Sequence, residues 1–153
     1  MTNVKLTPLQ LKYLFEYGLE NIDPDGLVMR GYNKGEFLCE QGVPLEHLFI
    51  VTAGRVKVCS MAANGKTLLY CFHEQGKILG EVEFMTQAFA SSSVCAVTDV
   101  QCILIPHEIY RDYLMSNVGF LKKISLTMAE IITETSTNGA SNILYPFETR
   151  LCA

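Results

Sequence analysis

The segment ILGEVEFMTQAFASSSVCAV, residues 78–97, carries residue types that could hold a sugar phosphate. Gly80-Glu81 opens it, and three serines at 91–93 close it. A carboxylate can accept hydrogen bonds from ribose hydroxyls, and a turn of backbone N–H groups with nearby hydroxyls can donate to a phosphate. Between these two features, however, there is no lysine or arginine. A phosphate bound here would lack a positive counter-charge.

The six cysteines form no pattern for a metal cluster or a redox pair. None belongs to a C-x-x-C motif, and most lie in apolar, strand-like runs such as RVKVCSM and LLYCFH. Cysteine in such runs is usually a small buried hydrophobe, so we expect free thiols in a reducing compartment and a cytoplasmic protein. The residues are Cys39, Cys59, Cys71, Cys95, Cys102 and Cys152.

The three histidines do not indicate a metal enzyme. The nearest approach to a ligand set is His73 with Glu74 and Glu81, which offers too few ligands at unsuitable spacing. His47 and His107 lie near the starts of expected elements. We therefore expect no metal site and no catalytic residue.

Composition indicates one well-cored globular domain with an appended helix. The chain has 153 residues, 49% of them hydrophobic and 18% charged. Its net charge is −4 and no basic cluster occurs, which argues against DNA binding by this chain alone. The N-terminus lacks the apolar core of an export signal, and no run of 18 apolar residues predicts a membrane span.

The first element is predicted to be a helix over residues 6–20. Thr7 is a candidate N-cap, with proline after it and Gln10 positioned to complete a capping box. An apolar stripe is expected along this helix. It consists of Leu9, Leu14, Phe15 and Leu19.

Residues 27–106 predict short strands separated by turns, typical of an antiparallel roll or barrel. Ala53-Gly54 and Asn64-Gly65 are expected to join consecutive strands as hairpins. The predicted strands are 27–32, 36–40, 47–52, 55–61, 67–73, 93–97 and 100–106.

After residue 106 the pattern becomes helical again. A short helix is predicted over 106–115, and a long one over 118–144 with Phe120, Ile124, Met128, Ile131 and Ile132 on one side. Its second half is small and polar, so it needs a partner or a ligand to be stable.

The order of these motifs resembles the effector domain of the Crp/Fnr bacterial transcription regulators. FIVTAGRVKV is similar to a strand pair of that family, and LGEVEFM to the start of its phosphate-binding cassette. The resemblance implies a mainly β fold with flanking helices, a double-stranded β-helix (jelly-roll) domain over 1–117. It further implies a dimerisation helix over 118–144, and it identifies YPFETRLCA, 145–153, as the opening of a truncated helix-turn-helix domain.

The family dimerises through its long helix, so the resemblance implies a homodimer. The implied interface residues are Ile124, Met128, Ile131, Thr135 and Gly139.

The resemblance also implies a ligand pocket. In members that bind cyclic AMP, the glutamate matching Glu81 accepts from the ribose 2′-hydroxyl, and a Thr-Ser pair matching Thr135-Ser136 contacts the adenine. The phosphate-binding arginine would match Ala90 or Ser91 and is missing. The implied contacts are Gly80, Glu81, Ser91, Ser92, Ser93, Thr135 and Ser136.

The missing arginine argues against tight cyclic AMP binding. A charged hydrogen bond contributes about 1.5–3 kcal/mol and a neutral one about 1 kcal/mol. The shortfall of about 1–2 kcal/mol corresponds to roughly a tenfold or larger loss of affinity. We therefore expect a different small-molecule effector or none. Lys57 and Lys77 are the candidate cations for the phosphate position of the pocket.

Three other interpretations follow from related folds. An iron–sulfur cluster of the Fnr kind is excluded, because no cysteine precedes Cys39 and no close pair exists. A cupin-like metal enzyme would need histidines that the chain lacks. A stand-alone cyclic-nucleotide sensor without a DNA role stays open as the alternative.

Overall fold

The computed structural model describes residues 5–137 and begins with the predicted capped helix, α1 (Pro8–Glu16). The N–H of Gln10 donates to Thr7 Oγ1 at 3.2 Å, and the N–H of Thr7 donates to Gln10 Oε1 at 2.9 Å. The capping box is confirmed. A short 3₁₀ turn, η1 (Pro24–Gly26), leads from the following loop to the first strand.

The predicted apolar stripe of α1 is only half correct. Leu14 and Leu19 are buried, but Leu9 and Phe15 are 44% and 67% exposed. The helix ends at Glu16, so the helical spacing does not extend to Leu19, and the inner face is completed by tyrosines 13 and 17 instead.

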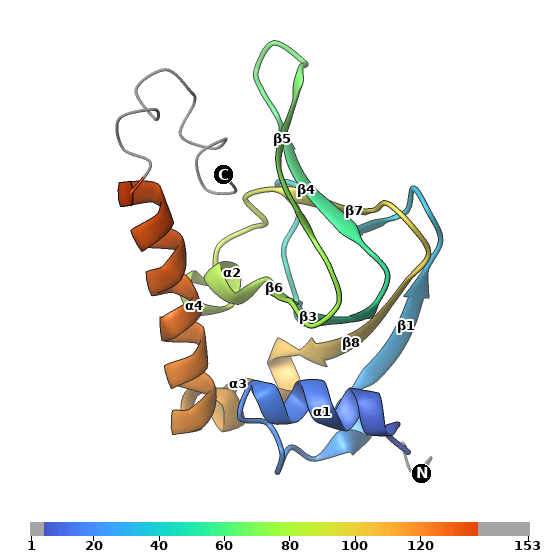
Figure 1. Cartoon of the computed structure of the whole chain (residues 1–153), viewed down its shortest axis with the longest axis vertical. Coiled ribbons are helices and arrows are strands. Elements are labelled where there is room, and N and C mark those ends of the chain that lie inside the picture. Colours follow the sequence, from blue (N-terminus) through green and yellow to red (C-terminus); the bar gives the residue numbers. More distant parts are fainter. Residues whose placement is uncertain (1–4, 138–153) are drawn as a thin grey trace.

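Eight strands form two four-stranded antiparallel sheets, which confirms the jelly-roll (Figure 1). Their order is β1-β8-β3-β6 in one sheet and β2-β7-β4-β5 in the other. The strands are β1 (Val28–Tyr32), β2 (Phe37–Cys39), β3 (His47–Ala53), β4 (Val56–Met61), β5 (Thr67–His73), β6 (Ile78–Leu79), β7 (Ser93–Ala96) and β8 (Val100–Pro106). The seven predicted strands are confirmed, and β6 was missed.

One of the two predicted hairpins is wrong. Asn64-Gly65 does connect β4 to its antiparallel partner β5. Ala53-Gly54 instead carries the chain from β3 in one sheet to β4 in the other. Gly54 has φ +91°, and a Cβ there would lie 2.3 Å from the carbonyl oxygen of Asp99, so this crossing requires glycine.

Successive side chains along β3 and β8 point to opposite faces of the β1-β8-β3-β6 sheet and so contribute to two hydrophobic cores, one on each face. In β3, Leu48 and Ile50 pack toward the helices, whereas Phe49 and Val51 pack toward the second sheet. Strand β8 alternates in the same way. The central strands β3 and β8 are therefore buried on both faces, and they hold the helices and the roll in a fixed relationship.

Three further helices flank the roll: α2 (Glu81–Thr86), α3 (His107–Met115) and α4 (Val118–Thr137). Figure 1 shows α1 and α3 at one end of the roll and α4 running along its side past α2. Helix α4 begins at the predicted residue. Its predicted end at 144, and the segment 145–153, lie outside the described residues.

Ile124 is 2% exposed and packs in the helix-side core of its own chain. Its side chain therefore has no surface left for a second copy, which corrects its place among the candidate interface residues. Met128 is half-buried against the same core. The side chains of Ile131 and Thr135, and the whole of Gly139, lie outside what the structure describes.

Four of the cysteines are free thiols, as predicted; Cys71 is disulfide-bonded and is the exception. The four are Cys39, Cys59, Cys95 and Cys102. Among residues 5–137, no helix has the length and hydrophobicity needed to cross a bilayer.

Candidate functional site

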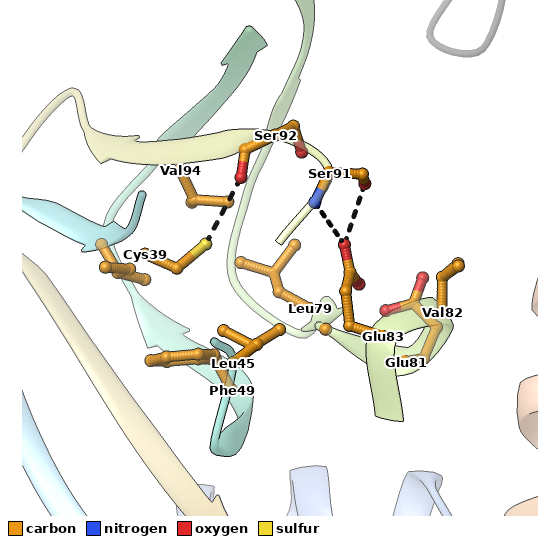
Figure 2. A pocket seen from close by; sticks show the side chains of 12 residues that line it. Cys39, Leu45, Phe49, Leu79, Glu81, Val82, Glu83, Ser91, Ser92 and Val94 are labelled. Atoms are coloured by element: carbon orange, nitrogen blue, oxygen red, sulfur yellow. Dashed lines mark hydrogen bonds between the residues drawn. The ribbon is translucent and has the colours of Figure 1, made fainter. Parts of the chain in front are cut away.

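The segment 78–97 forms one wall of a cavity of about 140 Å³ at the edge of the roll (Figure 2). Its other wall comes from the β2 region and from β3, and it is apolar. The lining residues are Leu38, Cys39, Leu45, Phe49, Leu79, Gly80, Glu81, Val82, Glu83, Ser91, Ser92 and Val94. Four of the predicted ligand residues are thus brought together here: Gly80, Glu81, Ser91 and Ser92.

Gly80 sets the direction in which the chain leaves β6 to form the polar wall of the cavity. Its φ is +89°, a left-handed conformation, and it forms the N-cap of α2. A Cβ at this position would lie 2.9 Å from Leu45 Cδ2 and 3.2 Å from the carbonyl oxygen of His47. Glycine is therefore required both by the backbone and by the close approach of β3, and this turn places the next residue, Glu81, at the cavity.

Glu81 is a half-buried carboxylate at the start of α2. Burial raises its pKa above the ordinary value, and the neighbouring charge of Glu83 raises it further. A backbone hydrogen bond and the more distant Lys77 act in the opposite direction. A carboxylate whose charge is disfavoured in this way gains from a ligand that donates hydrogen bonds to it.

Glu83 lies beside Glu81 on α2 and is bound to the serine run. Its Oε1 accepts from the hydroxyl of Ser91 at 2.9 Å and from the backbone N–H of Ser91 at 3.2 Å. Figure 2 shows this carboxylate directed across the cavity mouth to Ser91. The donors that sequence reasoning assigned to a phosphate therefore already have an acceptor within the chain.

The cavity has no cation among its lining residues. Lys57 and Lys77, the two lysines considered from the sequence, are exposed and do not line it. Burial raises the pKa of the Cys39 thiol to about 11, so this group is neutral at physiological pH, and its Sγ lies 3.8 Å from the carbonyl oxygen of Ser92. The formal charge of the lining is therefore that of two glutamates.

Residues 29–117, more than half of the chain, match the family model described as "Cyclic nucleotide-binding domain". The chain belongs to this family. Among curated proteins, this cyclic nucleotide-binding domain is 25% identical to regulatory protein YeiL of Escherichia coli O157:H7 over 118 residues. That match covers 77% of the chain and 54% of YeiL, so the chain spans about half of that relative's length.

Two solved structures show the same fold. The sensor domain of the transcriptional regulator DNR from Pseudomonas aeruginosa has a TM-score of 0.62 at 17% identity, covering 91% of both chains. The regulatory subunit of a cAMP-independent protein kinase A from Trypanosoma cruzi, bound to guanosine, has a TM-score of 0.62 at 23% identity. It covers 80% of this chain and 49% of that one. The predicted cyclic-nucleotide-binding-like family and fold are confirmed, and the resemblance to Crp/Fnr effector domains agrees with the matches to YeiL and DNR.

Ser93 is placed differently from the other predicted contacts of this cyclic nucleotide-binding domain. It does not line the cavity, and its hydroxyl accepts from the backbone N–H of Gln41 at 2.9 Å. Its role is to hold the strand β7 against the loop after β2. Thr135 and Ser136 belong to α4 by their backbone, but their side chains are outside the described residues, so their contact with a ligand stays a prediction.

Sequence reasoning missed Glu83 and the apolar wall. The spacing G-E-x-E puts the second carboxylate two residues after Glu81, which would have been a usable signal once a helix was expected there. The histidines do not converge on the cavity. Within the part of the chain that the structure describes, no three His, Cys, Asp or Glu side chains are grouped as metal ligands.

A contact behind the cavity links it to the long helix. Phe84 follows Glu83 on α2, is fully buried, and meets Phe120 of α4 edge-on with ring centroids 6.2 Å apart. The same ring contacts His107 of α3 at 5.0 Å. The two carboxylates and the phenyl ring therefore belong to one short rigid element.

Proposed function

We propose that this domain senses a small molecule that is not an anion and reports its binding to α4. It does so as the effector domain of a homodimeric, cytoplasmic Crp/Fnr-type transcription regulator. The observation that carries the proposal is the cavity itself, with two carboxylates, hydroxyl and thiol groups, and no lining cation. A phosphate in it would be partly desolvated without a counter-charge, which is unfavourable.

A nucleoside suits this lining better than a cyclic nucleotide does. The 2′- and 3′-hydroxyls of a ribose can donate to Glu81, while Phe49 and Leu79 offer an apolar surface. The cavity of about 140 Å³ is smaller than the roughly 300–1,000 Å³ typical of drug-sized ligands, so it would hold the sugar and leave the base outside. The guanosine bound to the Trypanosoma cruzi regulatory subunit supports this ligand class.

The route to the long helix runs through α2. A ligand that displaces Glu81 shifts the same short helix that holds Phe84 against Phe120. Helix α4 then has two packings with different ligand affinity, which is the condition for allosteric coupling. The DNA-reading part of such a regulator would follow α4. The names of YeiL and DNR as regulators support the transcriptional role.

The ligand class is tested by calorimetry with guanosine and with cyclic AMP. Guanosine should give an isotherm, cyclic AMP should give none at low micromolar concentration, and Glu81→Gln should weaken guanosine binding at least about tenfold. Glu36→Gln, which removes an exposed carboxylate that does not line the cavity, is the matched control. A clear cyclic AMP isotherm at low micromolar concentration, or the absence of guanosine binding, contradicts the proposed ligand class.

A further inference from the structure

The serine run contains an anion site that is filled from within the chain. Ser91 presents a backbone N–H and a hydroxyl in the same direction, and both donate to one oxygen of Glu83, at 3.2 Å and 2.9 Å. Two converging donors on one carboxylate oxygen are the arrangement that would otherwise bind an oxygen of a ligand anion. Here the anion is a side chain eight residues earlier in the sequence.

The charge of Glu83 also acts on the rest of the cavity. It raises the pKa of Glu81 and that of the Cys39 thiol, on the α2 wall and on the β2 wall respectively. No lining residue carries an opposing positive charge. An anionic ligand would have to displace Glu83 from Ser91 and then remain beside two carboxylates.

We propose that Glu83 is a specificity determinant: by occupying the donors of Ser91 and charging the cavity negatively, it excludes anions and restricts the pocket to neutral or cationic ligands. This inference rests on the proposed function, that the cavity is the effector site. It adds that the exclusion is an active property of one side chain, beyond the absence of an arginine.

Two substitutions separate the two parts of this role. Glu83→Gln removes the charge but keeps an oxygen that can accept from Ser91. Glu83→Ala removes the charge and also frees both donors. Glu36→Gln changes the net charge of the chain by the same amount at an exposed position that does not line the cavity, and so controls for the change in net charge. Thermal unfolding checks that each variant remains folded.

The experiment compares guanosine with cyclic GMP, two ligands that share a base and a ribose and differ in the charged phosphate. Dissociation constants are measured by chemical-shift titration into the millimolar range, so that weak binding is still quantified. In Glu83→Ala the ratio of the cyclic GMP constant to the guanosine constant should fall at least about tenfold, equivalent to about 1.4 kcal/mol. Glu83→Gln should show a smaller fall, and Glu36→Gln none.

The outcomes distinguish this inference from the proposed function. If guanosine does not bind the unaltered chain, the proposed ligand class is wrong. A gain of cyclic GMP binding in Glu83→Ala relative to Glu36→Gln would still support the role of Glu83. Conversely, if both Glu83 variants fold and bind cyclic GMP no better than the unaltered chain, the role of Glu83 is refuted, whether or not guanosine binds.

Discussion

Phe84 of α2 and Phe120 of α4 meet edge-on, with their ring centroids 6.2 Å apart and their planes at 88°. Both rings are fully buried, so neither can move without displacing the other. Phe84 is separated by one peptide bond from Glu83, which faces the cavity. The pair therefore connects the candidate ligand site directly to α4, the helix proposed to form the dimer.

This connection predicts the effect of Phe120→Leu. The smaller side chain loses the edge-on contact, and the free energy of unfolding should fall by less than the ~3–5 kcal/mol typical of Phe→Ala in a core. Guanosine affinity should change less than about threefold, whereas the ligand-induced change in hydrogen exchange of the α4 amides should shrink. Ile22→Val, a change in the same core that leaves the ring pair itself intact, should preserve that ligand response. An undiminished response in Phe120→Leu would exclude the ring pair as the route.

Tyr17 secures the turn that precedes the cavity. Its hydroxyl donates to the carbonyl of Gly76 at 2.8 Å and accepts from the N–H of Ile78 at 3.0 Å, and burial raises its pKa to about 12. Tyr17→Phe leaves that buried N–H without an acceptor, so we expect a loss of about 1–3 kcal/mol in urea denaturation.

Tyr32→Phe is the control for this change, because the Tyr32 ring is also buried while its hydroxyl makes no hydrogen bond within residues 5–137. Its effect should stay within about 0.5 kcal/mol. Equal effects of the two substitutions would show that the Tyr17 hydroxyl does not stabilise the turn.

The lowered pKa of His107 predicts that the folded domain loses stability in mild acid. The residue is 9% exposed, and burial lowers its pKa to about 4, with the charges of Arg111 and His47 acting in the same direction and Glu83 against them. Since the folded pKa lies below the unfolded value of 6.5, this contribution is complete above pH 6.5 and is lost as the pH falls toward 4.

Urea denaturation of the unaltered chain and of His107→Gln between pH 7.5 and about pH 4.5 measures this contribution. The difference in unfolding free energy between the two should shift by about 1–2 kcal/mol across that window, allowing for screening by solvent. Because Glu81 and the other histidines titrate in both proteins, the difference isolates His107. Parallel stability curves would contradict the prediction.

The strands were predictable because each is a short run of β-branched and aromatic residues bounded by turn residues, but their assignment to sheets was not. In β3 and β8 both faces are buried, so no polar face marks which neighbour each strand has, and Ala53-Gly54 resembled a hairpin although it joins two sheets. Strand β6 and helix α2 are too short to produce a periodic signal. The carboxylate of Glu83 could not be placed on Ser91 without the left-handed turn at Gly80, and this turn is what assembles the site.

The dimer proposed for α4 cannot use Ile124, one of the interface residues inferred from the sequence. Ile124 faces the core, whereas Leu126 is 54% exposed and shares an outer face of the helix with Lys122, Ala129 and Thr133, all exposed. Leu126→Asp should convert a dimer to a monomer in sedimentation velocity, because a carboxylate at the centre of a helix pair is desolvated without a partner. The unfolding free energy of the isolated monomer should change by no more than about 0.5 kcal/mol, since the side chain is solvent-exposed there.

Ile109→Asp provides the matched control for Leu126→Asp. Ile109 is a similarly exposed aliphatic residue on α3, so its replacement changes charge and surface hydrophobicity by the same amount away from α4. It should sediment like the unaltered chain. If Leu126→Asp does so too, the outer face of α4 near Leu126 is not the interface. If Ile109→Asp alone dissociates the dimer, α3 takes its place.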